Sequence, residues 1–387
     1  MLLRLLRNMP KEDLRNKRVL LRVDFEVPVQ NGQIQDDYRI RMVFPTIEYL
    51  LSGGAKILLL TKRGHFDVQK TSEMSTRALL PYLEDKLKQK ITFISSFEEI
   101  EKFSADSSSR LFMFENLRFW PEEEKNDESF AKKFANSADI YVSDNFGTAH
   151  RNHATVATLP RLMPSYAGFL LEKEVESLEK ITNGTAKPVA IILGGAKLET
   201  KAPALKKFLN AGDTVLAGGE LANIILSSQG KALGQNCINE RDKKYLEGAD
   251  LKSLNLNLPI DGLAGTDLKS AENYTDIADI SSNECIFDIG PRTVENFSDK
   301  LKSAKTIFWN GPMGIIEDPR CAIGTLGLAN QLKGLSAFKI LGGGDSIAIL
   351  EKNNLLGVFN HISTGGGSML EFLAGDKLPG VEALKEN

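Results

Sequence analysis

The chain has 387 residues, which is more than one ordinary hydrophobic core accommodates and therefore indicates two domains. With 42% hydrophobic and 26% charged residues it has the composition of a soluble globular protein, and no apolar run reaches the roughly 18 residues of a membrane span. The net charge of −3 gives no general attraction to nucleic acid or to an anionic membrane, so we expect neither as a partner.

The cysteines and the N-terminus indicate a cytoplasmic setting. Cys237, Cys285 and Cys321 are odd in number and far apart, and no CxxC occurs, which argues against a disulfide framework and against a zinc site. The apolar stretch at the start is too short for a signal peptide, because Pro10 and Lys11 follow at once. We therefore expect a reducing cytoplasm.

Strand-like and helix-like runs alternate along the first half of the chain. The predicted strands are 19–23, 56–60, 111–114 and 138–142, and a helix is predicted at 45–51. Short apolar strands separated by helices are typical of a parallel sheet that is covered on both faces.

Charged side chains gather where the strands of this half end. The group consists of Asp24, Arg39, Arg118, His150, Arg151 and His153, and His65 lies in a further loop. The carboxyl ends of parallel strands share one edge of the sheet, where ligands bind. Arginines and histidines at such an edge favour recognition of a small carboxylate or phosphate, although any single histidine could be purely structural.

An amphipathic helix predicted at 169–180 separates the two halves and ends at Asn183-Gly184. We interpret it as a helix that bridges two lobes; the alternative is an ordinary surface helix. The second half repeats the alternation, with strands predicted at 189–193, 214–217, 306–309, 338–341 and 358–362. The predicted fold class is therefore α/β, with two doubly wound parallel-sheet lobes joined by an interdomain helix and a cleft between them.

Two loops of the second half carry candidate nucleotide-binding residues. Lys197 and Lys201 are four residues apart, so they share one face if a helix begins there, and a polyphosphate between them would relieve their repulsion. In the second loop, Gly and Pro flank Met313, a combination suited to packing on a flat ring, and Glu317 could accept hydrogen bonds from a ribose. Neither a GxxxxGK[ST] run nor a GxGxxG run occurs.

Two glycine triplets, 342–344 and 365–367, each lie between a strand-like run and a helix-like run. Glycine allows close approach of the backbone to a ligand, and a helix N-terminus offers free N–H groups and a partial positive charge. The triplets therefore predict phosphate seats. Asp345, which follows the first triplet, is a candidate Mg²⁺ ligand or, alternatively, a helix N-cap.

Many runs of this chain match landmarks of one family in the same order. They include RVDF, DDYRI, ENLRF, SDNFGTAHR, ILGGAK, FDIGPRT, WNGPMG, GGGDS and STGGG. On these runs the chain resembles phosphoglycerate kinase over nearly its whole length.

The resemblance implies a monomeric cytoplasmic enzyme of glycolysis and gluconeogenesis, with two lobes that close over a cleft. The family reaction moves a phosphoryl group reversibly between 1,3-bisphosphoglycerate and ADP, giving 3-phosphoglycerate and ATP, with Mg²⁺ as cofactor. The implied domains are an acid-binding lobe at 1–167, with 375–387 packing back on it, an interdomain helix at 168–186 and a nucleotide-binding lobe at 187–374.

The resemblance also implies residue roles. The implied catalytic residues are Arg39, Lys201, Gly344 and Gly367. The implied acid-binding residues are Asp24, Glu26, Arg39, Lys62, His65, Arg118, His150 and Arg151. The implied nucleotide-binding residues are Lys197, Lys201, Gly219, Asn310, Pro312, Glu317, Gly343, Gly344, Asp345 and Ser346, and Asp345 would also hold Mg²⁺.

The chain departs from the family in the acid-binding lobe. The family usually has Asn where Glu26 stands, His where Lys62 stands and Arg where His65 stands. A carboxylate at contact distance repels an anionic substrate by roughly 1–4 kcal/mol, unless Lys62 pairs with it. We therefore predict an active kinase whose acid binding is weakened or, through His65, sensitive to pH.

Three other interpretations remain open. The first is a related kinase with a different carboxylate acceptor, which the changes at Glu26, Lys62 and His65 suggest. The second is a nucleotide-binding protein of reduced activity, against which the presence of both Arg39 and Lys201 argues. The third is a dinucleotide dehydrogenase, which the missing GxGxxG makes a poor fit.

Overall fold

The computed structural model describes residues 2–30, 33–64, 70–106, 108–183, 186–234 and 238–386. The chain divides into two compact units, one formed by Met1–Val175 with Lys377–Asn387 and the other by Glu176–Asp376. The division falls inside helix α7 (Phe169–Thr182), the long helix predicted at this place. The predicted domain boundaries and the cleft between the lobes stay predictions.

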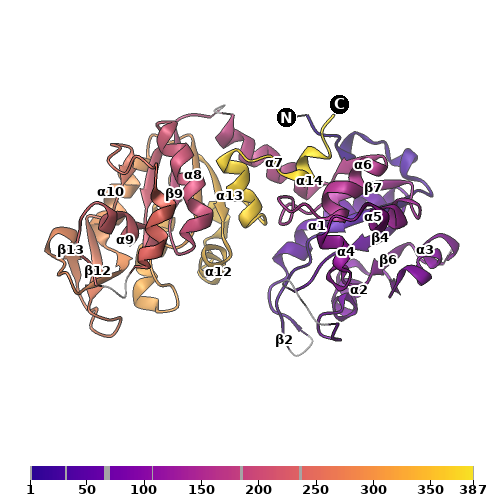
Figure 1. The fold of residues 1–387 in the computed structure, drawn as a ribbon, viewed down its shortest axis with the longest axis horizontal. Coiled ribbons are helices and arrows are strands. Elements are labelled where there is room, and N and C mark those ends of the chain that lie inside the picture. Colours follow the sequence, from indigo (N-terminus) through magenta and orange to yellow (C-terminus); the bar gives the residue numbers. More distant parts are fainter. Residues whose placement is uncertain are drawn as a thin grey trace. The chain divides into compact units, whose positions relative to one another are not determined.

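The first unit contains a six-stranded sheet in which all neighbouring strands run parallel (Figure 1). Its strands, in spatial order, are β5 (Ile91–Ile94), β6 (Leu111–Phe114), β4 (Lys56–Leu60), β1 (Arg18–Val23), β7 (Ile140–Asp144) and β8 (Ser165–Ala167). A short antiparallel hairpin, β2 (Val29–Gln30) and β3 (Gln33–Ile34), lies outside this sheet.

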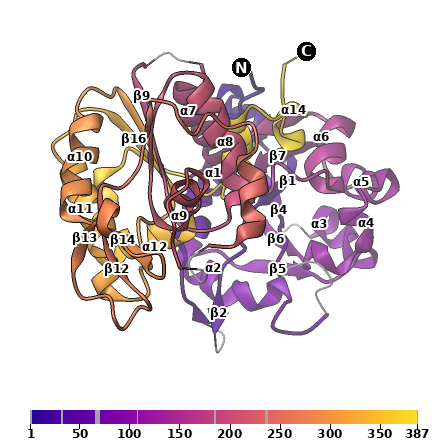
Figure 2. The same ribbon diagram turned by 60° about the vertical axis from the view of Figure 1, so that its left-hand side comes forward.

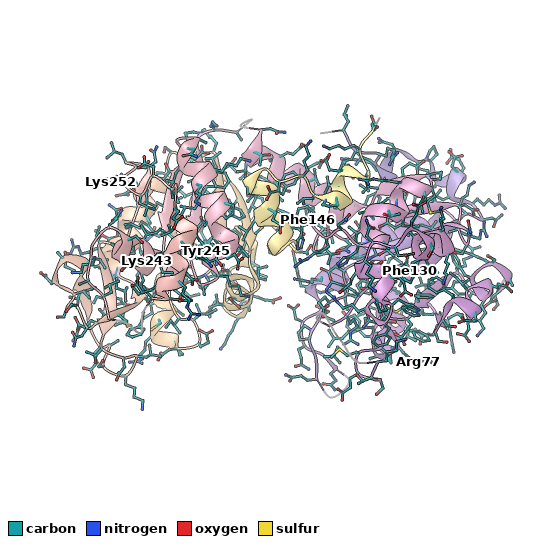
Figure 3. All side chains as sticks on the ribbon, in the orientation of Figure 1. Arg77, Phe130, Phe146, Lys243, Tyr245 and Lys252 are labelled. Carbon is teal, nitrogen blue, oxygen red and sulfur yellow. The ribbon has the colours of Figure 1, made fainter. Side chains whose placement is uncertain are left out.

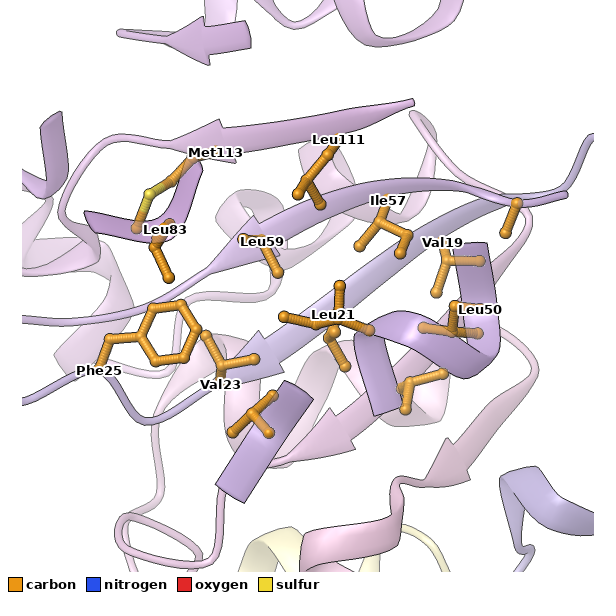
Figure 4. Packing of buried hydrophobic residues seen from close by; sticks show 14 of the residues in the cluster. Val19, Leu21, Val23, Phe25, Leu50, Ile57, Leu59, Leu83, Leu111 and Met113 are labelled. Carbon is orange, nitrogen blue, oxygen red and sulfur yellow. The ribbon is translucent and has the colours of Figure 1, made fainter. Parts of the chain in front are cut away.

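Both faces of this sheet are covered because alternate strand residues point to opposite sides. Val19 and Leu21 of β1 belong to a core cluster with Leu50, shown in Figure 4, whereas Leu20 belongs to a second cluster with Phe130, labelled in Figure 3. Helices α1 (Tyr38–Ser52) and α2 (Leu80–Leu87) contribute to the first cluster, and α3 (Glu101–Ala105), α5 (Glu128–Ala135) and α6 (Leu159–Leu162) to the second. Other short helical segments are η1 (Leu6–Asn8), η2 (Lys11–Leu14), η3 (Thr76–Leu79), η4 (Phe97–Glu99), η5 (Leu117–Phe119), α4 (Pro121–Glu124) and η6 (Ala154–Thr158).

The end of the chain lies on the first unit. Helix α14 (Pro379–Glu382) packs against η6, and the N–H of Gly380 donates to the carbonyl of Ala149 at 2.9 Å. Leu3 forms an antiparallel bridge with Lys385. The C-terminal segment therefore contacts the loop that carries His150 and Arg151.

The second unit contains another six-stranded parallel sheet and a smaller antiparallel one. The parallel sheet has the order β11 (Leu256–Asn257), β10 (Thr214–Ala217), β9 (Val189–Leu193), β15 (Thr306–Asn310), β16 (Phe338–Gly342) and β17 (His361–Ile362). The antiparallel sheet has the order β13 (Tyr274–Asp276), β12 (Asp261–Gly265) and β14 (Cys285–Ile289).

Helices pack in pairs in this unit. Helices α10 (Pro291–Leu301) and α11 (Ile323–Leu332) lie side by side in Figure 2, and α8 (Leu198–Asn210) lies beside α13 (Gly367–Ala374). The remaining helical segments are α9 (Gly219–Ser228), η8 (Glu240–Leu246), η9 (Ile277–Asp279), η10 (Pro319–Cys321), α12 (Gly344–Lys352) and η11 (Leu356–Val358). Within the described part of the chain, no helix has the length and apolar character needed to cross a bilayer.

The α/β fold with two parallel sheets is confirmed, and two details differ from expectation. The strand predicted at 358–362 is reduced to His361–Ile362, because Leu356–Val358 forms a 3₁₀ turn. The antiparallel sheet was not predicted, since its short strands give a weak pattern.

Cys285 is disulfide-bonded, whereas Cys321 is a free, buried thiol. The sequence argument, which was directed against a disulfide framework, did not anticipate a bond at Cys285. It rested on distance along the chain, which does not determine distance in space.

Asp144, the last residue of β7, is a fully buried carboxylate at the start of α7. Its Oδ1 accepts the N–H of Leu171 at 3.0 Å, and the absence of a side chain on Gly168 makes room for it. Burial raises the pKa of Asp144 to about 7, although hydrogen bonds from Thr46 and the helix start act in the opposite direction. Burial of the charge therefore outweighs the favourable helix end.

Asp144→Asn should flatten the pH dependence of stability. In the folded chain Asp144 keeps its proton up to about pH 7, whereas in the unfolded chain it ionises near its ordinary value, so the free energy of unfolding falls as pH rises between these values. Urea unfolding of the intact chain from pH 4 to 8 should show this fall in the wild type and a smaller one in the variant.

Asp139 provides a control of opposite sign. Its hydrogen bond from Arg18 lowers the pKa of this carboxyl, so the stability it contributes is present above the unfolded pKa and is lost as pH falls. Asp139→Asn should therefore lower stability at neutral pH. If the free energy of unfolding changes with pH in the same way in the wild type and in Asp144→Asn, burial does not raise the pKa of Asp144.

Candidate active site

The first predicted site begins where β1 ends. Asp24 is 3% exposed, and its Oδ2 accepts a hydrogen bond from Nη1 of Arg39 at 3.0 Å. Its Oδ1 accepts the N–H of Glu26 at 3.2 Å. Arg39 lies in the first turn of α1 and is 37% exposed, so a fixed carboxylate holds an accessible guanidinium at the strand edge. Such a group is suited to binding a carboxylate or phosphate.

The predicted pairing of Lys62 with Glu26 is confirmed. Nζ of Lys62 lies 2.9 Å from Oε2 of Glu26, and Oε1 accepts the N–H of Gly64 at 3.0 Å. The hydroxyl oxygen of Thr61 accepts the N–H of Phe25 at 3.1 Å, which joins the ends of β1 and β4. The predicted acid-binding residue His65 lies outside the described residues.

Further cations surround these residues. Arg118 of η5 forms an ion pair with Glu124, and burial lowers the pKa of its guanidinium, with the charge of Arg151 acting in the same direction. Burial and the charges of Arg151 and Lys62 lower the pKa of His150 to about 4. His150 is therefore neutral near pH 7, and the positive charge of the cluster comes from arginine and lysine.

Arg22 is a buried member of this environment that the sequence analysis did not single out. Its Nε donates to the hydroxyl of Thr155 at 3.0 Å, and that hydroxyl donates to the buried carboxylate of Glu123 at 2.6 Å. Burial, together with the charges of Arg22 and other cations, lowers the pKa of His153 to about 3. The sequence feature that could have identified Arg22 is its position as the one charged residue in the apolar strand run 19–23.

The second predicted site depends on a close glycine contact. A Cβ on Gly311 would lie 2.1 Å from the carbonyl oxygen of Gly194, and φ of Gly311 is +90°. A Cβ on Gly194 or on Gly218 would in turn collide with the side chain of Met313. Met313 is fully buried beneath these loops, whereas Pro312 of the same turn lines the neighbouring cavity, so the expectation that this turn packs on a flat ring stays a prediction.

A cavity of about 540 Å³ lies beside these loops. Its wall includes the predicted residues Gly219, Pro312, Glu317 and Asp345. It also includes residues that were not predicted, among them Glu220, Asn223, Asn239 and Phe287. Burial and then the charge of Asp242 raise the pKa of Glu220.

The two predicted lysines do not share a helix face. Helix α8 begins at Leu198, and Lys197 is its N-cap residue with φ 61°. Lys201 lies inside the helix, is 6% exposed, and donates from Nζ to the carbonyl of Ala196. Burial and the charge of Lys197 lower the pKa of Lys201 to about 8, whereas Asp345 and Glu220 act in the opposite direction.

Both glycine triplets lead into helices as predicted. Gly343 (φ 93°) and Gly366 (φ 52°) occupy the N-cap positions of α12 and α13, so Gly344 and Gly367 are the first helical residues. Asn310, at the end of β15, is buried beside Gly343. Within the described residues, the buried hydroxyl of Ser346 has no hydrogen-bond partner.

Asp345 is suited to bind a metal ion that is also bound by the phosphate oxygens of a ligand. It is the second residue of α12 and lines the cavity, whereas Gly343 holds the N-cap position, so the N-cap alternative for Asp345 is wrong. The described residues contain no group of three or more His, Cys, Asp or Glu able to hold a metal. A single carboxylate fits Mg²⁺, which usually takes one or two carboxylates together with phosphate oxygens.

Comparisons with known proteins identify the family. The profile of the phosphoglycerate kinase family matches residues 9–376. Phosphoglycerate kinase of Moorella thermoacetica is 39% identical over 383 residues, which cover 97% of this chain and 98% of that relative. Phosphoglycerate kinase of Dictyoglomus turgidum is 39% identical over 386 residues, which cover 97% of each chain.

Solved structures agree with this result. Phosphoglycerate kinases from Coxiella burnetii and Pyrococcus horikoshii each superpose with a TM-score of 0.86 at 33% identity, covering 99% and 98% of this chain and 98% of each of theirs. Because the family profile, the relatives and the structures all span nearly the whole sequence, the chain belongs to the phosphoglycerate kinase family.

Proposed function

We propose that this chain reversibly transfers a phosphoryl group between the acyl phosphate of 1,3-bisphosphoglycerate and ADP, giving 3-phosphoglycerate and ATP in glycolysis. The observation that carries the proposal is the cavity whose wall holds Asp345, a carboxylate whose charge acts on Lys201. Phosphoryl transfer is catalysed mainly by positioning and by stabilising charge. A polyphosphate seat with a metal ligand and an ammonium group supplies both.

In the second unit, the nucleotide occupies the cavity. Pro312 and Glu317 hold the nucleoside, and the free N–H groups at the starts of α12 and α13 bind phosphate oxygens. Asp345 would hold Mg²⁺, which would neutralise charge on the phosphate oxygens. Lys201 exchanges the carbonyl of Ala196 for a phosphate oxygen and stabilises the negative charge of the transferring group.

In the first unit, the acid occupies the cationic cluster. Arg118 and Arg151 bind its anionic groups, and neutral His150 contributes a hydrogen bond rather than a charge. Asp24 orients Arg39 toward the carboxyl group that accepts the phosphoryl group. We further propose that the enzyme acts as a monomer in the cytoplasm, which rests on the family alone and is tested by sedimentation and by cell fractionation.

Arg39→Met should lower kcat for the reaction of ATP with 3-phosphoglycerate about 100- to 1000-fold, because it removes the cation that stabilises the transferring group. Arg41→Met is the matched control, since Arg41 lies two residues along the same helix, is 48% exposed and pairs with Asp37. Steady-state measurement of kcat in both variants tests this, and only Arg39→Met should show the loss. Equal losses in the two variants would assign the effect to α1 as a whole.

Asp345→Asn should raise the Mg²⁺ concentration needed for half-maximal activity by at least about tenfold, because it removes the protein ligand. Asp299→Asn, on the exposed face of α10, should leave it unchanged. Calorimetric titration of Mg²⁺ into the chain saturated with ADP gives a second readout. An unchanged Mg²⁺ affinity in Asp345→Asn would place the metal elsewhere.

The affinity for ADP should fall as pH rises above 8. The pKa of Lys201 is about 8 in the free chain and rises when phosphate binds, so binding takes up a proton above pH 8 and weakens by up to about tenfold per pH unit. Lys201→Met should remove this dependence between pH 7.5 and 9.5, whereas Lys206→Met on the same helix should keep it. A dependence that persists in Lys201→Met would assign it to another group.

A further inference from the structure

A carboxylate lies inside a cluster that otherwise carries positive charge. Glu26 acts through its charge on Arg63 and on Arg118, and its side chain is 33% exposed. Glu26 also forms part of the wall of a cavity of about 590 Å³ that includes Gly64, Glu73 and Met74. An anion arriving at this cluster therefore meets Glu26 as well as the cations.

The two carboxylate oxygens of Glu26 accept from two donor groups, and each of these donors could otherwise bind an anion. Oε2 pairs with Nζ of Lys62 at 2.9 Å, and Oε1 accepts the N–H of Gly64 at 3.0 Å. An ammonium group and a free backbone N–H are the usual donors to phosphate and carboxylate oxygens. Glu26 thus takes the position that an oxygen of a bound anion would take.

The ion pair with Glu26 keeps Lys62 from binding another anion. Arg63 is close to Glu26 but donates from Nη1 to the carbonyls of Glu73 and Ser75, both at 2.8 Å. The side chain of Lys62 is only 12% exposed, so the ion pair is partly shielded from water. Shielding makes an ion pair stronger than it is on an open surface.

The backbone fixes Glu26 in this place. Its N–H donates to Oδ1 of Asp24 at 3.2 Å, and the other oxygen of Asp24 holds Arg39 at 3.0 Å. The neighbouring N–H of Phe25 donates to the hydroxyl of Thr61, the residue before Lys62. Glu26 and Lys62 therefore face each other from the ends of adjacent strands β1 and β4.

We infer that Glu26 is an internal competitor of the acid substrate, which holds Lys62 and Gly64 until a phosphorylated carboxylic acid displaces it. The inference rests on the proposed function and adds a residue that sets affinity for the acid. Glu26 lowers this affinity in two ways: it must give up Lys62, and its charge stays near the bound anion. Lys62 contributes to acid binding only after the exchange.

The test is calorimetric binding of 3-phosphoglycerate to the full chain. Glu26→Gln should bind the acid about tenfold more tightly, because the charge is lost while the shape is kept. Lys62→Met should bind about tenfold more weakly, because the acid loses a partner and an unpaired carboxylate remains. Independent effects of these sizes would place the double variant at the wild-type affinity, so the coupling that the contact between Glu26 and Lys62 predicts should appear as a departure from that affinity.

Two controls separate competition from a general change of charge or structure. Glu73→Gln removes a carboxylate from the same cavity wall without touching Lys62, and its affinity for the acid should not change. Glu26→Asn is a second variant that removes the charge with a shorter side chain, and it should also bind more tightly. In steady state, KM for the acid should fall in Glu26→Gln without a rise in kcat.

The outcomes distinguish this inference from the proposed function. Turnover with 3-phosphoglycerate in the wild type, with no gain of affinity in either Glu26 variant, would overturn the inference and leave the function standing. A gain of the same size in Glu73→Gln would also overturn it, because any carboxylate would then act alike. Wild-type chain that neither binds nor converts 3-phosphoglycerate would instead overturn the proposed function.

Discussion

Parallel strand pairing in register is the constraint on which the candidate site of each unit depends. Strand β1 pairs with β4 and with β7, so that Arg22 lies opposite Leu60 and Ser143 and the strands end at one level. The loops that carry the cations therefore leave the same edge of the sheet. In the second unit the same pairing sets Asn310 opposite Leu193, and the residues that follow meet at a contact only glycine allows.

The same electrostatic arrangement occurs in both units. The cations assigned to substrate are held by acceptors of the chain itself: Arg39 by Asp24, Arg118 by Glu124, Lys62 by Glu26 and Lys201 by the carbonyl of Ala196. Each acceptor lowers the energy of a buried or half-buried cation before any ligand is bound. In the proposed reaction, substrate binding is an exchange of partners for these cations, and the strength of the internal contact helps to set the affinity.

The sequence predicted the parts of this chain that follow local rules. Strands such as β9 and β10, the helix α7 and the glycine-led starts of α12 and α13 were predicted, because apolar runs and glycine act through the nearby backbone. The pairing of Lys62 with Glu26 was also anticipated, because a carboxylate in an anion-binding site repels the substrate unless a cation pairs with it. What could not be predicted depends on tertiary packing: the buried Met313, the backbone turn that removes Lys197 from α8, and the disulfide at Cys285.

The central claim is that this chain makes an acyl phosphate from 3-phosphoglycerate and ATP. The most direct measurement is ³¹P NMR of the purified chain with MgATP and 3-phosphoglycerate, in which the transferred group is seen on the product itself. We expect ADP and an acyl phosphate resonance to appear together and both to disappear when 3-phosphoglycerate is left out. Formation of inorganic phosphate without an acyl phosphate, or no change in the spectrum while ADP still binds, would contradict the account.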